Sequence, residues 1–264
     1  YSVFLEIFFK SLKSKNFKKP IILICSKQLL INQMNKLGFK FKINLLDRKK
    51  INIKQIDNNK INLIDIKFNF KKTFDRISNK SNLYIEECFT VALNLLKENR
   101  YAGLINGPIS KKNFLRHRFL GITEYLAKKD KKNKVAMLIY NKKLSVSPIT
   151  THLPLKYVHK NINKKKIIDH VKLLKKFYKK EFNKNPKIAI TGLNPHCESN
   201  YKSSEEDRII KPAIKSLINS KYNIKGPFAA DTLFLKENLK KYDIIVGMYH
   251  DQVLTPLKTL FGFD

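Results

Sequence analysis

The sequence predicts an α/β protein built on a largely parallel sheet. Two observations lead to this class. Short apolar runs rich in β-branched residues alternate with amphipathic segments, and polar, histidine-bearing segments directly follow several of those runs. Strands that alternate with helices form parallel sheets, and open α/β sheets bind their ligands at the carboxyl ends of the strands.

The first half of the chain predicts three helices and four strands. Helices are expected over residues 3–13, from Ser26 to about Leu37 with Gly38 as the cap, and over 86–98 with an apolar face that includes Cys88. Strands are expected at 20–25, 39–45, 61–66 and 101–106. The alternation of the second strand predicts one shared face for Phe39, Phe41, Ile43 and Leu45.

The second half continues the alternation. Strands are expected at 135–140, 144–150, 187–191 and 242–248, and helices at 163–181 and from Ser204 to about Ser220. Ser204 precedes Glu205, Glu206 and Asp207, acidic residues that suit the positive end of a helix dipole.

Composition bounds the class of protein. The chain has 264 residues, of which 43% are hydrophobic, enough for two modest domains with a sizeable core. Three cysteines without a CxxC spacing indicate a reducing compartment, and no apolar run approaches the length of a membrane span. With no export signal, we expect a cytoplasmic protein and no membrane partner. Because the chain lacks an initiator Met and ends without a polar tail, we expect a fragment open at both ends.

The formal charge of +33 raises the alternative of a nucleic-acid-binding protein. Six arginines stand against 48 lysines, and the lysines are spread along the chain together with abundant Asn, Ile, Phe and Tyr. An A/T-rich genome explains this mixture better than selection for phosphate contacts, which favours arginine forks in a localised patch. We therefore expect no nucleic-acid partner and keep that class as a minority alternative.

Three predicted strand ends each carry a histidine, namely His152, His196 and His250. Imidazole is a common ligand of zinc-like metals, and three protein ligands with one open position form the catalytic pattern. A single histidine after a strand is more often an ordinary polar residue, but three at equivalent junctions indicate a shared site. His117, His159 and His170 lie in lysine-rich or helical settings and are interpreted as surface or packing residues.

Other polar residues accompany these histidines. Asp251, Gln252 and Lys258 follow His250 and are expected to face the same site. Asp231 is a further candidate, although a helix N-cap is an equally ordinary role for it. No glycine arrangement forms a dinucleotide or Walker motif, so the residues alone predict a metal site and no substrate.

Seven short motifs then carry a family resemblance. They are residues 106–111, 121–124, 151–155, 192–196, 230–234, 248–252 and 256–258. In kind and order they resemble the 4-hydroxythreonine-4-phosphate dehydrogenase family of pyridoxal phosphate biosynthesis, over essentially the whole chain. Ile122 departs from the pattern, because many family members have His there.

The resemblance implies a two-domain α/β/α fold like that of isocitrate and isopropylmalate dehydrogenases, with the active site in the interdomain cleft. Residues 1–117 would form a first α/β domain that lacks its N-terminal loop and C-terminal return segment. Residues 118–264 would form the second α/β domain, which carries the three histidines. A homodimer is implied, with the metal site shared between its subunits.

The resemblance also implies the chemistry. His152, His196 and His250 would bind zinc, magnesium or cobalt, and Thr123 and Lys258 would bind substrate. The reaction is the oxidation of 4-phosphooxy-L-threonine by NAD or NADP, followed by decarboxylation to 3-amino-2-oxopropyl phosphate. Asp231 and Asp251 are candidates for orienting the histidines or for proton transfer.

Two alternatives remain open at this point. A related metal-dependent dehydrogenase would act on threonate or erythronate 4-phosphate. A metal-dependent hydrolase or lyase would use the same histidines without NAD.

Overall fold

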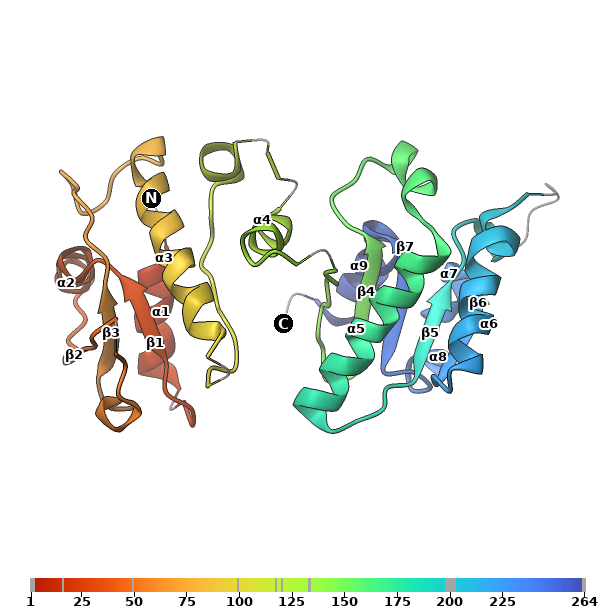
Figure 1. Cartoon of the computed structure of the whole chain (residues 1–264), viewed down its shortest axis with the longest axis horizontal. Coiled ribbons are helices and arrows are strands. Elements are labelled where there is room, and N and C mark those ends of the chain that lie inside the picture. Colours follow the sequence, from red (N-terminus) through yellow and green to blue (C-terminus); the bar gives the residue numbers. More distant parts are fainter. Residues whose placement is uncertain are drawn as a thin grey trace. The chain divides into compact units, whose positions relative to one another are not determined.

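The computed structural model describes residues 3–15, 17–48, 50–98, 100–116, 118–119, 121–132, 134–197 and 203–262. The chain divides into two compact units, Tyr1–Ile122 and Thr123–Asp264, and each has a sheet of its own (Figure 1). The domain boundary predicted between residues 117 and 118 falls at His117. That residue lies outside the described ranges, so the boundary and the surface or packing role of His117 stay predictions.

The first unit has a parallel sheet of three strands in the order β1-β3-β2. Its helices and strands are α1 (Phe4–Ser14), β1 (Ile22–Cys25), α2 (Lys27–Lys36), β2 (Ile43–Leu45), β3 (Ile61–Asp65) and α3 (Asn82–Leu96). The central strand is β3, where Leu63 pairs with Leu23 on one side and Leu45 on the other.

Helices cover both faces of this sheet. Phe9 of α1 and Leu30 of α2 are fully buried against Leu23 and Leu63, while Leu95 of α3 packs with Ile64 on the opposite face. The ends of α2 follow the sequence: the Ser26 hydroxyl accepts a hydrogen bond from Leu29 N, and Gly38 after the helix has a φ of 71°.

The second unit has a parallel sheet of four strands in the order β4-β7-β5-β6. Its elements are α4 (Ile122–Lys129), β4 (Ser145–Thr150), α5 (Lys164–Phe182), β5 (Ile188–Thr191), α6 (Lys211–Asn219), β6 (Ile224–Phe228), α7 (Ala230–Leu233), α8 (Lys236–Leu239), β7 (Ile244–Tyr249) and α9 (His250–Phe261). No helix in the described ranges is both long enough and apolar enough to cross a membrane.

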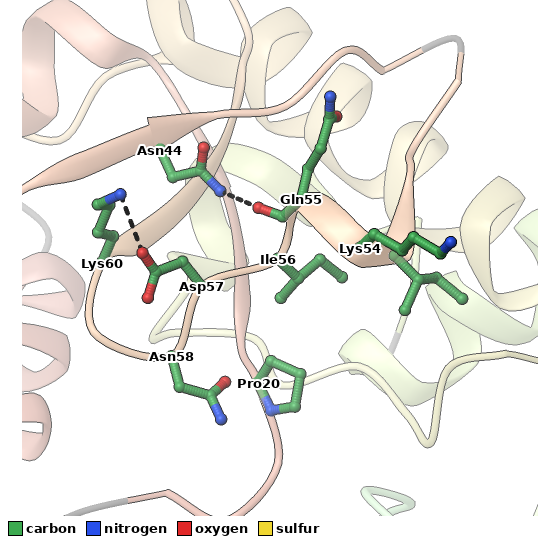
Figure 2. Close-up of a pocket in the computed structure, with 9 residues that line it drawn as sticks. Pro20, Asn44, Lys54, Gln55, Ile56, Asp57, Asn58 and Lys60 are labelled. Atoms are coloured by element: carbon green, nitrogen blue, oxygen red, sulfur yellow. Dashed lines mark hydrogen bonds and ion pairs between the residues drawn. The ribbon is translucent and has the colours of Figure 1, made fainter.

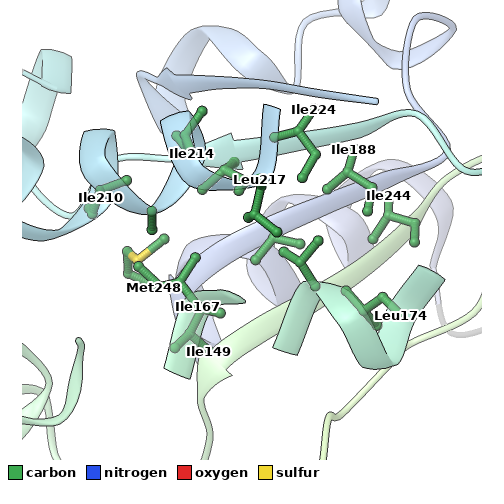
Figure 3. Close-up of a cluster of buried hydrophobic side chains, with 14 of the residues drawn as sticks. Ile149, Ile167, Leu174, Ile188, Ile210, Ile214, Leu217, Ile224, Ile244 and Met248 are labelled. Carbon is green, nitrogen blue, oxygen red and sulfur yellow. The ribbon is translucent and has the colours of Figure 1, made fainter. Parts of the chain in front are cut away.

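Two apolar layers enclose this second sheet. On one face α5 and α6 bury side chains such as Ile167, Leu174 and Leu217 against Ile188 and Ile244 (Figure 3). On the other face α9 packs Val253, Leu254 and Leu257 against the strands. In Figure 1, α5 and α6 run in front of the sheet and α9 behind it, so the second unit is an α/β/α sandwich.

A polar group is buried between α5 and β4. His170 of α5 is 4% exposed, and its Nε2 lies 2.6 Å from the Ser147 hydroxyl, which itself donates to Met137 O. Because that hydroxyl has a single proton to give, His170 Nε2 must carry a proton and donate it to Ser147. Burial, with the nearby positive charge of Lys166, lowers the pKa of His170 to about 4. His170 is therefore a neutral packing residue, as the sequence predicted.

The structure corrects two predicted strands. Residues 101–106, all of which are described, form no strand, and Ile105 is 82% exposed. Residues 135–140 contribute a single antiparallel bridge, between Ile139 and Val146. Both segments have suitable residue types, but a strand requires a continuous ladder with a neighbour, and neither segment has one among the described residues.

Other boundaries differ. The strand predicted at 39–45 is shorter in the structure, where β2 covers Ile43–Leu45. Phe39, Phe41 and Ile43 pack against the cluster around Phe9 and Leu30, as their alternation predicted, but Leu45 is 55% exposed. The predicted helix from Ser204 begins with a π-helical turn, Glu206–Ile210, before α6. β6 was not predicted, and neither was the helix α9, which forms the polar segment after β7.

Candidate functional site

The three candidate histidines follow three neighbouring parallel strands. His152 lies two residues beyond β4, His250 is the first residue of α9 directly after β7, and His196 lies five residues beyond β5. β7 is the middle strand of the three, with Thr150 paired to Tyr249 and Ile190 to Val246. All three histidines therefore lie at the carboxyl edge of one sheet, where α/β proteins bind ligands.

Two of the histidines approach each other. The ring centroids of His152 and His250 are 5.8 Å apart. Nδ1 of His250 lies 2.7 Å from Asp251 Oδ1, while the His250 side chain keeps 33% of its surface exposed. A carboxylate on Nδ1 favours the tautomer with the proton there, which leaves the lone pair of Nε2 for a ligand. Asp251 thus contacts a candidate ligand, and its two predicted roles, orienting a histidine and transferring a proton, stay predictions.

His196 stands in an unusual local conformation. It lies in a short 3-10 turn, Pro195–Cys197, with a φ of 58°, and Cys197 also has a φ of 58°. Residues other than glycine seldom adopt this left-handed region, and when they do the surrounding structure must hold them. The imidazole is exposed at the sheet edge.

The types of side chain at this edge suit a divalent metal, but their arrangement in the described part of a single chain does not complete a metal site. Imidazole nitrogens at one sheet edge are suitable ligands for zinc or cobalt. Among the described residues, however, no group of three or more His, Cys, Asp or Glu side chains is arranged to hold an ion. One chain brings His152 and His250 together and does not add His196 to them.

Asp231 belongs to the same edge. It lies in α7, three residues beyond β6, and its carboxylate accepts a hydrogen bond from Thr232 N. Burial, together with the negative charges of Glu206 and Asp231, raises the pKa of the Cys197 thiol beside His196. The N-cap of α7 is Ala229, so the alternative capping role of Asp231 is wrong.

Thr123 is placed next to the His152 loop through its neighbour. Thr123 and Glu124 lie in the first turn of α4, and Glu124 Oε1 accepts a hydrogen bond from the Thr151 hydroxyl at 3.0 Å. The other oxygen, Oε2, is buried without a hydrogen-bond partner among the described residues. The sequence motif included Glu124 but assigned it no role.

Lys258, predicted to bind substrate, lies on the same helix as His250 but well along it. It is exposed on α9, eight residues after His250, which corresponds to about 12 Å along a helix axis.

Two residues have roles that the sequence did not predict. Gln252, expected to face the site, instead bonds to the ends of β5 and β7. Glu206, interpreted as a residue at a helix start, is fully buried and accepts hydrogen bonds from the loop that leads to His196. No local pattern distinguishes either residue from ordinary helix-surface amides and acids.

A hollow of about 500 Å³ lies in the first unit (Figure 2). Its lining includes Asn44, Gln55, Asp57 and Lys60, and Asp57 forms an ion pair with Lys60 at 2.9 Å. The hollow is at the amino ends of the strands, since Lys60 directly precedes β3. We assign it no ligand, because open α/β sheets bind at the opposite edge. The predicted cleft between the domains stays a prediction.

The fold and the histidine edge define an α/β enzyme-like protein with a candidate metal site at the carboxyl ends of parallel strands. Residues 16–264 match the family model described as pyridoxal phosphate biosynthetic protein PdxA. The chain belongs to this family.

Named relatives agree with that membership. A 4-hydroxythreonine-4-phosphate dehydrogenase from Sulfurihydrogenibium sp. (strain YO3AOP1) is 41% identical over 204 residues, which are 76% of this chain and 62% of the relative. A protein of Oceanobacillus iheyensis, provisionally named D-threonate 4-phosphate dehydrogenase, is 32% identical over 66% of this chain and 54% of its own length. The chain thus spans less than two thirds of these two curated relatives.

Solved structures confirm the fold. The crystal structure of 4-hydroxythreonine-4-phosphate dehydrogenase from Klebsiella pneumoniae superposes with a TM-score of 0.85 at 26% identity. The match covers 100% of this chain and 81% of that one. The predicted α/β class with parallel sheets is confirmed.

Proposed function

We propose that the protein is a dehydrogenase that oxidises and decarboxylates 4-phosphooxy-L-threonine to 3-amino-2-oxopropyl phosphate, carbon dioxide and NADH. This reaction would serve pyridoxine 5'-phosphate biosynthesis. The observation that carries the proposal is the set of three histidines at the carboxyl edge of adjacent parallel strands, in a chain of the PdxA family.

His152, His196 and His250 would hold a zinc, magnesium or cobalt ion. When bound, such an ion would supply positive charge beside the substrate hydroxyl, which would favour loss of the hydroxyl proton and transfer of a hydride from the carbon that bears it. Neutral imidazoles leave that charge undiminished. Because one chain gathers two of the histidines, we propose a homodimer in which a second copy completes the site.

The remaining residues would bind and orient. Asp251 holds Nδ1 of His250, so that Nε2 points its lone pair away from the carboxylate. Lys258 would provide a positive charge for the phosphate or carboxylate of the substrate, and the Thr123 hydroxyl a hydrogen bond. Asp231, three residues beyond the carboxyl end of β6, would accept or return a proton. NAD or NADP would accept the hydride.

A neighbouring substrate class has its own support. By the family resemblance, Ile122 stands beside Thr123 where many members have His, and it would remove one polar contact for the substrate. The relative from Oceanobacillus iheyensis is provisionally named for D-threonate 4-phosphate. Threonate or erythronate 4-phosphate is therefore the second candidate substrate. A metal-dependent hydrolase or lyase without NAD is the alternative from another class.

The test uses the protein expressed from its complete reading frame. Reduction of NAD is followed by absorbance with 4-phosphooxy-L-threonine, in the presence of zinc, magnesium, cobalt or a chelator. We expect metal-dependent reduction that His196→Ala abolishes and that His159→Ala leaves unchanged, because His159 is exposed in the turn before α5 and is not one of the candidate ligands.

Each other outcome has a distinct meaning. Activity with D-threonate 4-phosphate alone would keep the enzyme class and change the substrate. Turnover without reduction of NAD or NADP would favour the hydrolase or lyase. A folded protein that binds metal but acts on neither phosphate would contradict the proposal.

A further inference from the structure

Gln252 joins the ends of two strands that carry candidate ligands. Its Oε1 accepts hydrogen bonds from Met248 N at 2.7 Å and from the Thr191 hydroxyl at 2.9 Å. Its Nε2 donates to Gly192 O at 2.8 Å. Thr191 ends β5 and Met248 lies near the end of β7, so one side chain links the strand before His196 to the strand before His250.

Glu206 holds the next part of the same loop. Its Oε1 accepts hydrogen bonds from Leu193 N at 2.7 Å and Asn194 N at 2.9 Å, and its Oε2 accepts from Asn194 Nδ2 at 2.9 Å. Burial alone would raise the pKa of Glu206, but these hydrogen bonds outweigh burial and lower it. A fully buried carboxylate therefore holds the backbone two residues before His196, in a turn with a left-handed histidine.

Two glycines make room for these side chains. A Cβ on Gly192 would lie 3.0 Å from Glu206 Oε1 and 2.6 Å from Cys197 Sγ. A Cβ on Gly247 would lie 3.1 Å from Gln252 Oε1 and 2.4 Å from a methyl group of Val253. The backbone at these two strand ends thus packs directly against the Glu206 carboxylate and the Gln252 amide, and a side chain at either glycine would displace them.

We propose that Gln252 and Glu206 are positioning residues that fix the strand ends and the loop from which His196 and His250 project, and so the orientation of each histidine. We call the two residues with their hydrogen bonds the Gln252–Glu206 frame. Neither residue needs to touch metal or substrate. The inference rests on the proposed function, because it assumes that these histidines are metal ligands. It adds that their geometry is fixed by an amide and a carboxylate from behind the site.

Metal affinity is the sensitive readout, since ligand nitrogens must be held closely and loss of supporting partners lowers affinity by roughly 10- to 100-fold. Co²⁺ binding would be titrated calorimetrically and by its visible spectrum. The variants are Gln252→Leu, which keeps the size and loses all three bonds, and Glu206→Gln, which keeps the shape and loses the charge. Thr191→Val removes only one hydrogen bond of the frame, and it tests the proposal if the two stronger variants fail to fold.

The expected result is graded. Co²⁺ affinity falls by roughly 10- to 100-fold in Gln252→Leu and Glu206→Gln, and by a few-fold in Thr191→Val. The exposed controls Gln28→Leu and Glu237→Gln keep the wild-type affinity and spectrum. Independently of metal, amide exchange at Met248 is expected to accelerate in Gln252→Leu, and exchange at Leu193 and Asn194 in Glu206→Gln.

The outcomes separate the two proposals. If the wild-type protein binds no Co²⁺, or if binding survives His196→Ala and His250→Ala, the metal site of the proposed function is wrong. The positioning role of the Gln252–Glu206 frame would then be wrong too. Wild-type binding that depends on both histidines, with unchanged affinity in folded Gln252→Leu and Glu206→Gln, would overturn the positioning role alone.

Discussion

At the residue scale, His170 couples folding to pH. Its ring is buried under β4 with a pKa of about 4, against an ordinary value near 6.5, so the unfolded chain binds a proton that the folded protein refuses. Stability is then fully present above pH 6.5 and is lost as the pH falls towards 4. We expect the free energy of unfolding to fall by about 2 kcal/mol between pH 7 and pH 5 from this group alone.

Urea unfolding at pH 7 and pH 5 measures this contribution. The matched variant is His170→Gln, whose amide can still donate to the Ser147 hydroxyl but does not titrate. Its unfolding free energy should change less between the two pH values than that of the wild type. An equal pH dependence in both proteins would show that His170 does not titrate as the burial implies.

Asp251 provides a second test at this scale. Its carboxylate holds Nδ1 of His250, and supporting carboxylates of this kind contribute roughly 10-fold or more to metal affinity. Asp251→Ala should therefore weaken Co²⁺ binding by about 10-fold, with little change in stability because Asp251 is 79% exposed. Titration of the variant beside Glu237→Ala checks this, and equal affinities would assign Asp251 to the solvent-facing surface only.

The sequence predicted the three candidate histidines but not the roles of Glu206 and Gln252. His152, His196 and His250 follow apolar runs, and the strand-end rule brings such residues to one edge whatever the details of packing. Glu206 and Gln252 act through tertiary contacts with Leu193 and Gly192, 13 and 60 residues away in sequence. Local spacing contains no information on such contacts, which explains why both residues were misjudged.

At the scale of elements, β6 shows why one strand went unpredicted. Its sequence contains Gly226 and Pro227, residues that usually argue against a strand. The structure places β6 at the edge of the sheet with a register shift against β5, a position that tolerates both. The opposite error, at 101–106, came from residues suited to a strand that has no neighbour in the described structure.

Gly226 is expected to be indispensable to β6. Its φ is 141°, and a Cβ there would lie 2.5 Å from the backbone oxygen of Ile190 in β5. We expect Gly226→Ala to destabilise the protein by about 2–3 kcal/mol, through backbone strain and overpacking. Gly103→Ala is the matched control, because a Cβ at Gly103 meets no atom within 4 Å.

Chemical unfolding of the two alanine variants gives the comparison directly. A loss in Gly226→Ala no larger than that in Gly103→Ala would mean that β6 can move away from β5 without consequence. The strand would then be a peripheral addition to the sheet, and its carboxyl end a poor anchor for α7 and Asp231.

At the scale of the whole molecule, each unit has apolar clusters on both faces of its own sheet, which is what independent folding requires. The candidate metal site differs, because one chain brings together His152 and His250 only. If His196 of a second copy completes the site, neither copy contains a whole site, and metal binding becomes a property of the dimer.

Subunit complementation tests this sharing. The variants His152→Ala, His196→Ala and His250→Ala should each bind almost no Co²⁺ alone. In a randomly assembled mixture of two different variants, half of the dimers are mixed and one of their two sites is intact, so about a quarter of wild-type binding should return. Because the His152 and His250 rings approach each other within one chain, we expect recovery in both mixtures that contain His196→Ala. The mixture of His152→Ala with His250→Ala should bind almost no Co²⁺, since the same chain supplies both histidines to a site and every chain in the mixture lacks one of them. If no mixture recovers binding, all three ligands belong to one chain and the shared site is wrong.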